Sequence, residues 1–238
     1  MTSLRVCQAA WLAAAFTMMP HEVRAESVAS ILKKADEVRN PSDSYLMTVD
    51  VKSTDAADSF TFEVSLKGNT KTLIETLKPA ASAGKKYLML DEEMWAFTPK
   101  MSKPARVSLN ERLTGMTANG DISRMRWSGD YDGTIEKSDG KSWQLLLKAT
   151  RKDLTYEKLR VWIAHDTYRP TKAEFLTPRG TLLKTATYGG YKELAGKQRP
   201  TEIVITSAGD GTKSSTISVV SMKNKTFPAS VFSQSALK

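Results

Sequence analysis

Short runs in which apolar and polar residues alternate dominate this chain. The alternation is clearest at residues 45–51 and 60–66, where every second side chain is large and apolar. A period of two places neighbouring side chains on opposite faces of a β-strand. Further strand-like runs occupy residues 70–77, 86–91, 94–98, 106–109, 133–137, 142–151, 158–165, 170–177, 181–191, 201–207 and 213–223. Gly, Pro, Asn and Asp separate the runs at hairpin intervals, so the sequence predicts a mainly β fold, a large curved antiparallel sheet or barrel.

Residues 26–40 carry the pattern of an amphipathic helix. Their apolar residues recur at spacings of three and four, which places them on one helical face. Ser27 is suited to begin the helix as its N-cap, and the Asn40-Pro41 pair is suited to end it. The apolar stripe consists of Val28, Ile31, Leu32, Ala35 and Val38.

A second helix is predicted in the middle of the chain. Ser108 and Glu111 match a capping box, in which a serine and a glutamate three residues later each bond to the other's backbone. We therefore expect a helix from about Asn110 to Asn119-Gly120. The tail, residues 228–238, is predicted to be a short helix or an arm.

Residues 1–25 have the features of a secretory signal peptide. A basic start at Arg5 precedes an apolar run over residues 6–19, and Val23-Arg24-Ala25 is a small-x-small cleavage site. The run is shorter than the roughly 18 to 20 apolar residues that a helical membrane span needs. We expect cleavage after Ala25, which leaves residues 26–238 as a single exported domain.

The single cysteine, Cys7, lies in this leader. The mature chain would then have no thiol for catalysis or metal binding and no cysteine for a lipid anchor. A chain of this length can build a core without disulfides, which fits the bacterial periplasm. Its net charge of +9 suits either simple solubility or transient contact with anionic membrane surfaces and acidic partners. No basic cluster interleaved with aromatic residues indicates nucleic acid.

The sequence offers little for catalysis. His165 is the only histidine of the mature chain and lies at a predicted hairpin tip, without a Gly-x-Ser-x-Gly motif elsewhere. Asp130, Asp132 and Gly133 resemble the start of a calcium loop, but the later ligands are missing and a turn explains them. No phosphate-binding glycine loop is present. We predict no enzyme activity, no metal site and no cofactor, although carboxylate pairs for glycoside hydrolysis depend on the fold and stay open.

Residues 86–127 concentrate the soft apolar side chains. Five of the ten methionines lie there beside Trp95, Phe97 and Trp127. Methionine repacks easily around irregular apolar shapes, so this region is suited to line a cavity for an apolar ligand. The same side chains would equally fill an ordinary core, because only volume separates a lined cavity from a packed one. The five methionines are Met89, Met94, Met101, Met116 and Met125.

The order of these features resembles the LolA-like family of bacterial outer-membrane lipoprotein-sorting proteins. The motif that carries the resemblance is Tyr87-Leu88, an acidic turn at residues 91–93, Met94-Trp95-Ala96-Phe97-Thr98-Pro99, a basic run at residues 100–106, and Ser108. The resemblance implies a mainly β (α+β) fold, a curved antiparallel incomplete β-barrel of about eleven strands whose concave side is covered by helices.

The resemblance also implies a function in the periplasm. A monomeric carrier would shield the acyl chains of a lipid or lipoprotein, receive them from an inner-membrane exporter and pass them to an outer-membrane acceptor. The expected lid is the helix from Asn110 with the loop of residues 100–104, hinged at Gly115 and Asn119-Gly120. The expected cavity residues are Met47, Phe60, Phe62, Met89, Met94, Trp95, Phe97, Met116 and Trp127, and those at its mouth are Lys100, Lys103, Arg106 and Arg112. The alternative is a periplasmic sensor that detects lipid in the same cavity and modulates a protein partner, and an enzyme is the third class.

Overall fold

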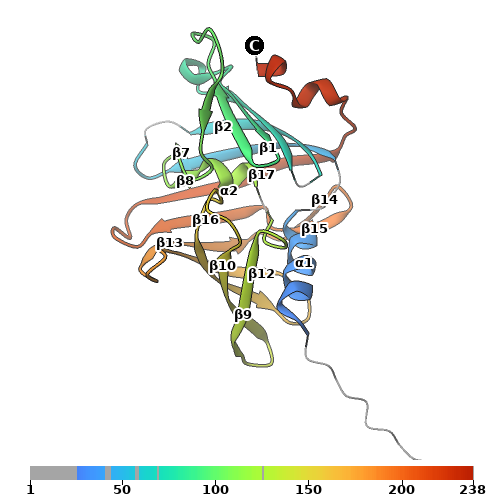
Figure 1. Cartoon of the computed structure of the whole chain (residues 1–238), viewed down its shortest axis with the longest axis vertical. Helices are drawn as coiled ribbons and strands as arrows, with labels where there is room; N and C mark the ends of the chain where they lie inside the picture. The colour runs from blue at the N-terminus through green and yellow to red at the C-terminus, as the bar shows by residue number, and fades with distance from the viewer. Residues whose placement is uncertain (1–25, 41–43, 57–58, 69, 125, 238) are drawn as a thin grey trace, which may run out of the picture.

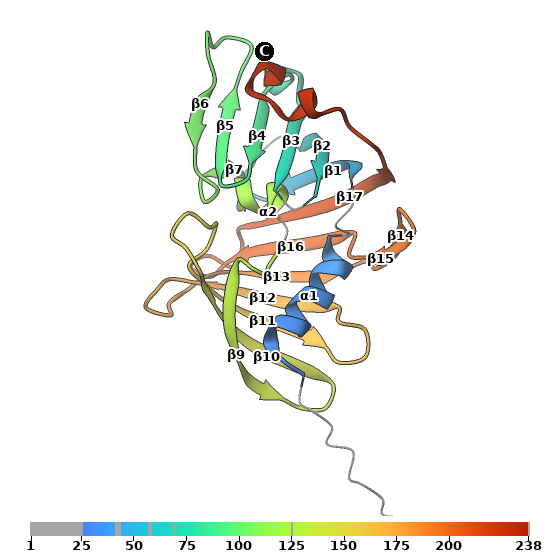
Figure 2. The same ribbon diagram turned by 45° about the vertical axis from the view of Figure 1, so that its right-hand side comes forward.

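One open antiparallel sheet of 13 strands forms most of the molecule. The structure is a computed structural model that describes residues 26–40, 44–56, 59–68, 70–124 and 126–237. The predicted signal peptide, with Cys7, and the residues Pro41 and Met125 lie outside these described residues. The sheet curves strongly and does not close into a barrel, as Figures 1 and 2 show. The predicted fold class is therefore confirmed, with two strands more in this sheet than the expected eleven.

The strands follow one another in the sheet largely in chain order. The exception is β17, which lies next to β1 and joins the two halves of the sheet. From one edge to the other, the strands are β6 (Ala105–Val107), β5 (Glu93–Phe97), β4 (Lys86–Leu90), β3 (Lys71–Lys78), β2 (Phe60–Lys67), β1 (Tyr45–Ser53), β17 (Ser214–Asn224), β16 (Glu202–Ser207), β13 (Leu182–Gly189), β12 (Pro170–Leu176), β11 (Lys158–Ala164), β10 (Ser142–Ala149) and β9 (Tyr131–Ser138).

The alternation in the sequence explains how these strands are oriented. Along β1, every second residue from Tyr45 to Ser53 is buried. Met47 lies opposite Val64 of β2 on one side and opposite Met222 of β17 on the other, so apolar residues of neighbouring strands meet on one face. Cross-strand apolar pairs of this kind fix the register, since a slip by one residue would turn all of them to the other face.

The helix α1 (Val28–Arg39) lies across the concave side, in front of β10 to β13 in Figure 2. The Ser27 side chain accepts a hydrogen bond from the Ser30 backbone N–H at 3.3 Å, as expected for an N-cap. The apolar stripe packs into the main core, where Ile31, Leu32 and Ala35 are each at most 1% exposed. Both the helix and its boundaries agree with the prediction from the sequence.

The second predicted helix is wrong. Residues 110–119 form a two-stranded hairpin of β7 (Arg112–Thr114) and β8 (Thr117–Ala118), and the short helix α2 (Asn119–Ser123) begins only where the predicted helix was to end. Gly115 has φ +49°, a left-handed conformation that interrupts a helix, and it lies so close to Ser53 that a Cβ would meet the serine Oγ at 1.9 Å. Glu111 still accepts from the Ser108 backbone N–H at 2.9 Å, so this contact of the capping box forms without the helix.

Smaller elements complete the fold. The sequence did not predict the hairpin of β14 (Lys192–Leu194) and β15 (Lys197–Arg199), which contacts α1. The 3-10 helix η1 (Ala80–Ser82) lies in the connection between β3 and β4. The predicted tail forms two 3-10 turns, η2 (Ala229–Phe232) and η3 (Gln234–Leu237), which pack against β3 to β5. In the part of the chain that the structure describes, no helix has both the length and the apolar character to cross a membrane.

Candidate ligand-binding cavity

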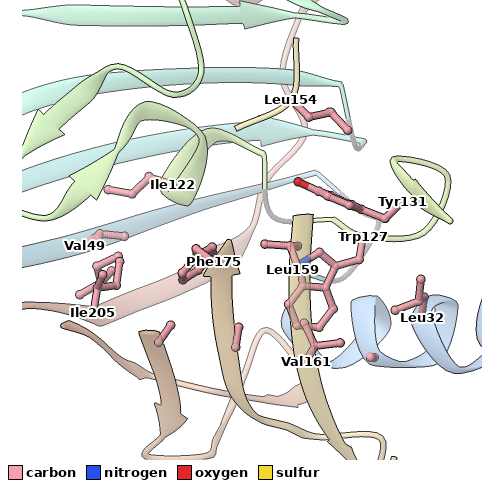
Figure 3. Packing of buried hydrophobic residues seen from close by; sticks show 14 of the residues in the cluster. Leu32, Val49, Ile122, Trp127, Tyr131, Leu154, Leu159, Val161, Phe175 and Ile205 are labelled. Carbon is pink, nitrogen blue, oxygen red and sulfur yellow. The ribbon is translucent and has the colours of Figure 1, made fainter. Parts of the chain in front are cut away.

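A cavity of about 70 Å³ lies between the concave face of the sheet, α2 and the residues Arg124, Arg126, Trp127 and Tyr131. Its wall is mostly apolar and comes from strands that are far apart in the sequence. β1, β12, β13, β16 and β17 contribute because their alternate residues face the concave side. Figure 3 shows several of these side chains pointing toward one another. The apolar wall residues are Met47, Val49, Ile122, Trp127, Tyr131, Leu159, Phe175, Ala186, Tyr188, Ile203, Ile205, Ile217 and Val219.

The cavity is too small for a hydrocarbon tail as it stands. A cavity of about 150 Å³ lined by aliphatic and aromatic side chains binds benzene, whereas this one is about 70 Å³. A groove of about 400 Å³ lies beside it, and Thr155 and Tyr156 belong to the walls of both. The cavity and the groove therefore adjoin at these two residues, and a tail that starts in the cavity would gain room by passing between them.

The helix α2 rests directly on this partition. Gly120 approaches Thr155 so closely that an added Cβ would lie 1.8 Å from the threonine Oγ1. Asp121, the next residue of α2, accepts a hydrogen bond from the Tyr156 hydroxyl at 2.8 Å and pairs with Lys184 at 3.0 Å. Burial raises the pKa of Tyr156 well above its ordinary value, so this hydroxyl stays protonated and donates to Asp121. The partition is thus a hydrogen-bonded contact between α2 and the segment around Tyr156, which lies between β10 and β11 and outside the strands of the sheet.

A buried aspartate on α1 orders the wall near the end of that helix. The Asp36 carboxylate accepts from the backbone N–H groups of Trp127, at 2.8 and 2.9 Å, and Ser128, at 2.7 Å. It also accepts from Arg39 at 3.1 Å. Burial raises the pKa of Asp36, and the Arg39 charge opposes that rise. Arg39 in turn stacks over Trp127, with its Cζ 3.6 Å from the ring centroid, so the carboxylate positions both residues in the cavity wall.

A second buried aspartate holds the segment that leads into β9. Asp130 accepts from Arg124 Nε at 2.6 Å and Nη2 at 2.8 Å, and from Arg126 at 2.9 Å. Arg124 also donates to the Asp91 carbonyl at 2.7 Å. Burial raises the pKa of Asp130, but the hydrogen bonds from the two arginines outweigh this and hold the pKa below its ordinary value. The sequence interpretation of Asp130 as a simple turn residue missed this ion pair.

The structure brings only some of the predicted cavity residues to this site. Met47 and Trp127 line the cavity, and Met116 lines the adjoining groove. Phe62 is buried in the main core with Phe60 packed beside it at a centroid distance of 5.9 Å, and neither lines the cavity.

The remaining four lie at the other end of the sheet. Met89 pairs across the strands with Met94 in a small cluster with Leu109, and Met94 lines a separate groove of about 170 Å³. Trp95 and Phe97 pack instead with the C-terminal tail, in a cluster that contains Leu88, Phe227, Phe232 and Leu237. Adjacent strand residues point to opposite faces, so Met94 and Trp95 never share one cavity.

The predicted mouth residues are also dispersed. Lys100 and Lys103 are exposed in the connection between β5 and β6 and line neither the cavity nor its grooves. Arg106 forms an exposed ion pair with Glu93 at 2.7 Å, and Arg112 lines the 400 Å³ groove. The charged residues of the cavity wall are instead Arg39, Asp121, Arg124, Arg126 and Arg199.

One of the missed polar residues had a signal in the sequence. Asp36 follows Leu32 by four residues, so a charged side chain occupies the buried stripe of an amphipathic helix. The arginines had no such signal, because Arg124, Arg126 and Arg199 meet at the cavity only in the folded chain. Within the described ranges, no group of three or more His, Cys, Asp or Glu side chains is arranged to hold a metal ion.

The chain is thus an open antiparallel sheet that curves around an apolar cavity, with helices over its concave face. A crystal structure of a LolA superfamily protein from Nitrosomonas europaea is 35% identical to this chain, with a TM-score of 0.83, and the match covers 89% of this chain and 100% of the other. The chain belongs to the LolA superfamily. The resemblance predicted from the motif around Met94-Trp95 is thereby confirmed.

Two further crystal structures share the fold at lower identity. A putative outer membrane lipoprotein-sorting protein domain from Vibrio parahaemolyticus is 22% identical, with a TM-score of 0.71, over 88% of this chain and 97% of the other. A DUF1329 family protein from Desulfovibrio piger is 20% identical, with a TM-score of 0.75, over the same shares of the two chains. A family model described as an uncharacterized protein matches residues 68–238. No match was found among curated protein sequences.

Proposed function

We propose that this protein is a periplasmic carrier that binds the acyl chain of a lipid or lipoprotein in the cavity and moves it between membranes. The observation that carries the proposal is the apolar cavity on the concave face, separated from a larger groove only by Thr155 and Tyr156. Each buried methylene contributes about 0.8 kcal/mol, so an acyl chain binds tightly once this partition opens. The proposal keeps Met47 and Trp127 as ligand contacts.

The wider setting of the proposal comes from the sequence. The predicted signal peptide would direct the mature chain to the periplasm, and the net positive charge, +9 over the full sequence, favours brief contact with anionic membrane surfaces. The carrier would take its cargo from an inner-membrane exporter and give it to an outer-membrane acceptor, acting as a monomer without catalysis. The name of the relative from Vibrio parahaemolyticus, a putative lipoprotein-sorting domain, points to the same kind of role.

Two adjacent residues of β17 provide a matched test. Val219 lines the cavity, whereas Val220 is 58% exposed. We expect Val219→Glu to weaken binding of a fluorescent fatty acid by about tenfold or more, because a carboxylate would enter an apolar site. Val220→Glu should bind as the wild type does. Equal binding by all three proteins would remove the cavity as the binding site.

A transfer assay separates the carrier from the sensor. The protein loaded with fluorescent lipid is mixed with acceptor vesicles, and mass spectrometry shows whether the lipid is chemically unchanged. A carrier transfers intact lipid to the vesicles. Retained lipid, together with lipid-dependent binding to a protein partner, would favour the sensor instead, and a changed lipid mass would indicate an enzyme.

A further inference from the structure

Arg199 is a buried cation without a carboxylate partner. Its side chain comes from β15 and lines the cavity, and the residue is only 2% exposed. Among the described residues, no carboxylate forms an ion pair with it. A buried charge without compensation is costly, and folded proteins normally pair such a group.

The hydrogen bonds of Arg199 do not account for all its donors. Nη2 donates to the Arg39 carbonyl at 2.8 Å, and Nη1 contacts the Met222 sulfur, which is a weak acceptor. Nε is buried and has no partner. The bond to Arg39 satisfies a carbonyl at the end of α1, which is a helix-capping role. That role needs one donor, and the guanidinium also lies over the Tyr45 ring with its Cζ 5.6 Å from the centroid. Neither contact provides a partner for Nε or an opposite charge.

The surrounding charges also leave an excess of positive charge. Arg39, which lines the same cavity, shares Asp36 with two backbone N–H groups, and Arg124 and Arg126 share the single carboxylate of Asp130. Burial lowers the pKa of Arg199, and the Arg39 charge lowers it further, although nearby Tyr45 opposes both effects. A bound anion would relieve the desolvation and the repulsion between the two arginines.

We propose that Arg199, together with Arg39, binds the oxyanion headgroup of an amphiphile, a carboxylate or a phosphate, whose acyl tail occupies the cavity and the adjoining groove. The inference rests on the proposed lipid-binding function and narrows its ligand to an anionic amphiphile. The cavity of about 70 Å³ exceeds the roughly 10 to 15 Å³ that one water needs, so it has room for a small polar headgroup before the partition opens. The tail then follows past Thr155 and Tyr156 into the 400 Å³ groove.

Three ligands with the same tail test the proposal: dodecanoate, dodecyl phosphate and dodecanol, each in competition with a fluorescent fatty acid. The wild type should bind the two anions about tenfold or more tightly than dodecanol, as expected for a charge-assisted hydrogen bond in a buried site. Arg199→Met should lose this preference and bind dodecanol with the affinity of the wild type. Arg199→Lys, which keeps the charge, should recover part of the preference.

A second variant controls for the structural role of the side chain. Arg199→Gln keeps a donor for the Arg39 carbonyl but removes the charge, so it should melt near the wild-type temperature and still lose the preference for anions. A helix cap alone would lower the melting temperature of Arg199→Met and leave the headgroup preference intact in both variants. An intact preference in both variants would overturn the proposal, whatever their melting temperatures.

The outcomes separate this inference from the lipid-binding proposal. If dodecanol and the two anions bind the wild type equally, the headgroup subsite is excluded and lipid binding stands. If none of the three binds, both proposals fail. Inorganic phosphate alone is the last ligand to be tested. If it binds as tightly as dodecyl phosphate, the site binds a free anion, and the proposal of an amphiphilic ligand is overturned.

Discussion

The two ends of the sheet use their buried side chains in different ways. Around β1 and β11 to β17, the concave face carries a cavity whose wall includes buried ion pairs, such as Arg124 with Asp130. Around β3 to β5, aromatic residues such as Trp95 are covered by the C-terminal tail, in a cluster of apolar residues. The cavity end therefore combines apolar lining with buried ion pairs. The tail end is covered by apolar packing, to which Lys67 and Lys86 add hydrogen bonds to tail carbonyls.

This difference between the two ends indicates that a ligand gains more free energy by binding at the cavity end. Apolar packing that already has a partner, as between Phe227 and Phe232 at a centroid distance of 5.6 Å, gains nothing from a guest. A cavity with unsatisfied donors gains both apolar contact and charge compensation. We therefore expect charge substitutions to act on stability at both ends of the sheet and on binding only at the cavity end.

The largest effect on stability is expected from Asp130→Asn. The change leaves Arg124 and Arg126 without their carboxylate, and breaking a buried ion pair costs about 3 to 5 kcal/mol. Urea unfolding at pH 7 measures the loss. Asp132→Asn, two residues further on and exposed, is the matched control and should leave the free energy of unfolding nearly unchanged. An equal loss of unfolding free energy in both variants would mean that the buried ion pair contributes no more to stability than an exposed carboxylate does.

The loss of stability in Asp130→Asn should also depend on pH. The pKa of Asp130 is below its ordinary value of 3.8 in the folded protein, so its ionised form adds stability above that pH. This contribution is lost as the pH falls through the lower folded pKa, because the folded and unfolded carboxyls are then both protonated. The difference in free energy of unfolding between wild type and Asp130→Asn should therefore shrink below about pH 4. A difference that stays constant down to pH 2 would contradict the ion pair.

A smaller effect is expected from Trp95→Glu at the tail end. Trp95 is half-buried between β5 and the tail, so a charge there should cost about 2 to 3 kcal/mol and loosen the tail. Thermal melting measures the stability, and proteolysis of residues 225–237 measures the tail. Fatty-acid binding by the folded variant should match that of Trp95→Phe, the conservative control. Loss of binding only in Trp95→Glu would move the ligand site to the tail end and reverse the comparison.

The sequence predicted the sheet well because the signal is local. The alternation of apolar and polar residues along β1 and β2 determines which face of each strand is buried. Each neighbouring strand continues the same buried face. The helix over residues 110–119 was wrong because Ser108 and Glu111 give a helix signal that the left-handed Gly115 overrides through its contact with Ser53. The local sequence contains the capping signal but not that long-range contact.

The site was harder to predict because its residues meet only in the folded chain. Arg199 reaches the cavity from the unpredicted β14–β15 hairpin, and the Asp36 partners lie about ninety residues away at Trp127 and Ser128. One error was avoidable, since Met94 and Trp95 are adjacent in a strand and so point to opposite faces.

The central claim is that the ligand binds at the cavity end, and tryptophan fluorescence tests it most directly. Two variants are prepared in which all tryptophans but one are replaced by phenylalanine, leaving either Trp127 in the cavity wall or Trp95 under the tail. A brominated fatty acid, which quenches tryptophan on contact, is then titrated into each. We predict quenching of Trp127 and no quenching of Trp95. Quenching of Trp95 alone, or of neither residue, would contradict binding in the cavity.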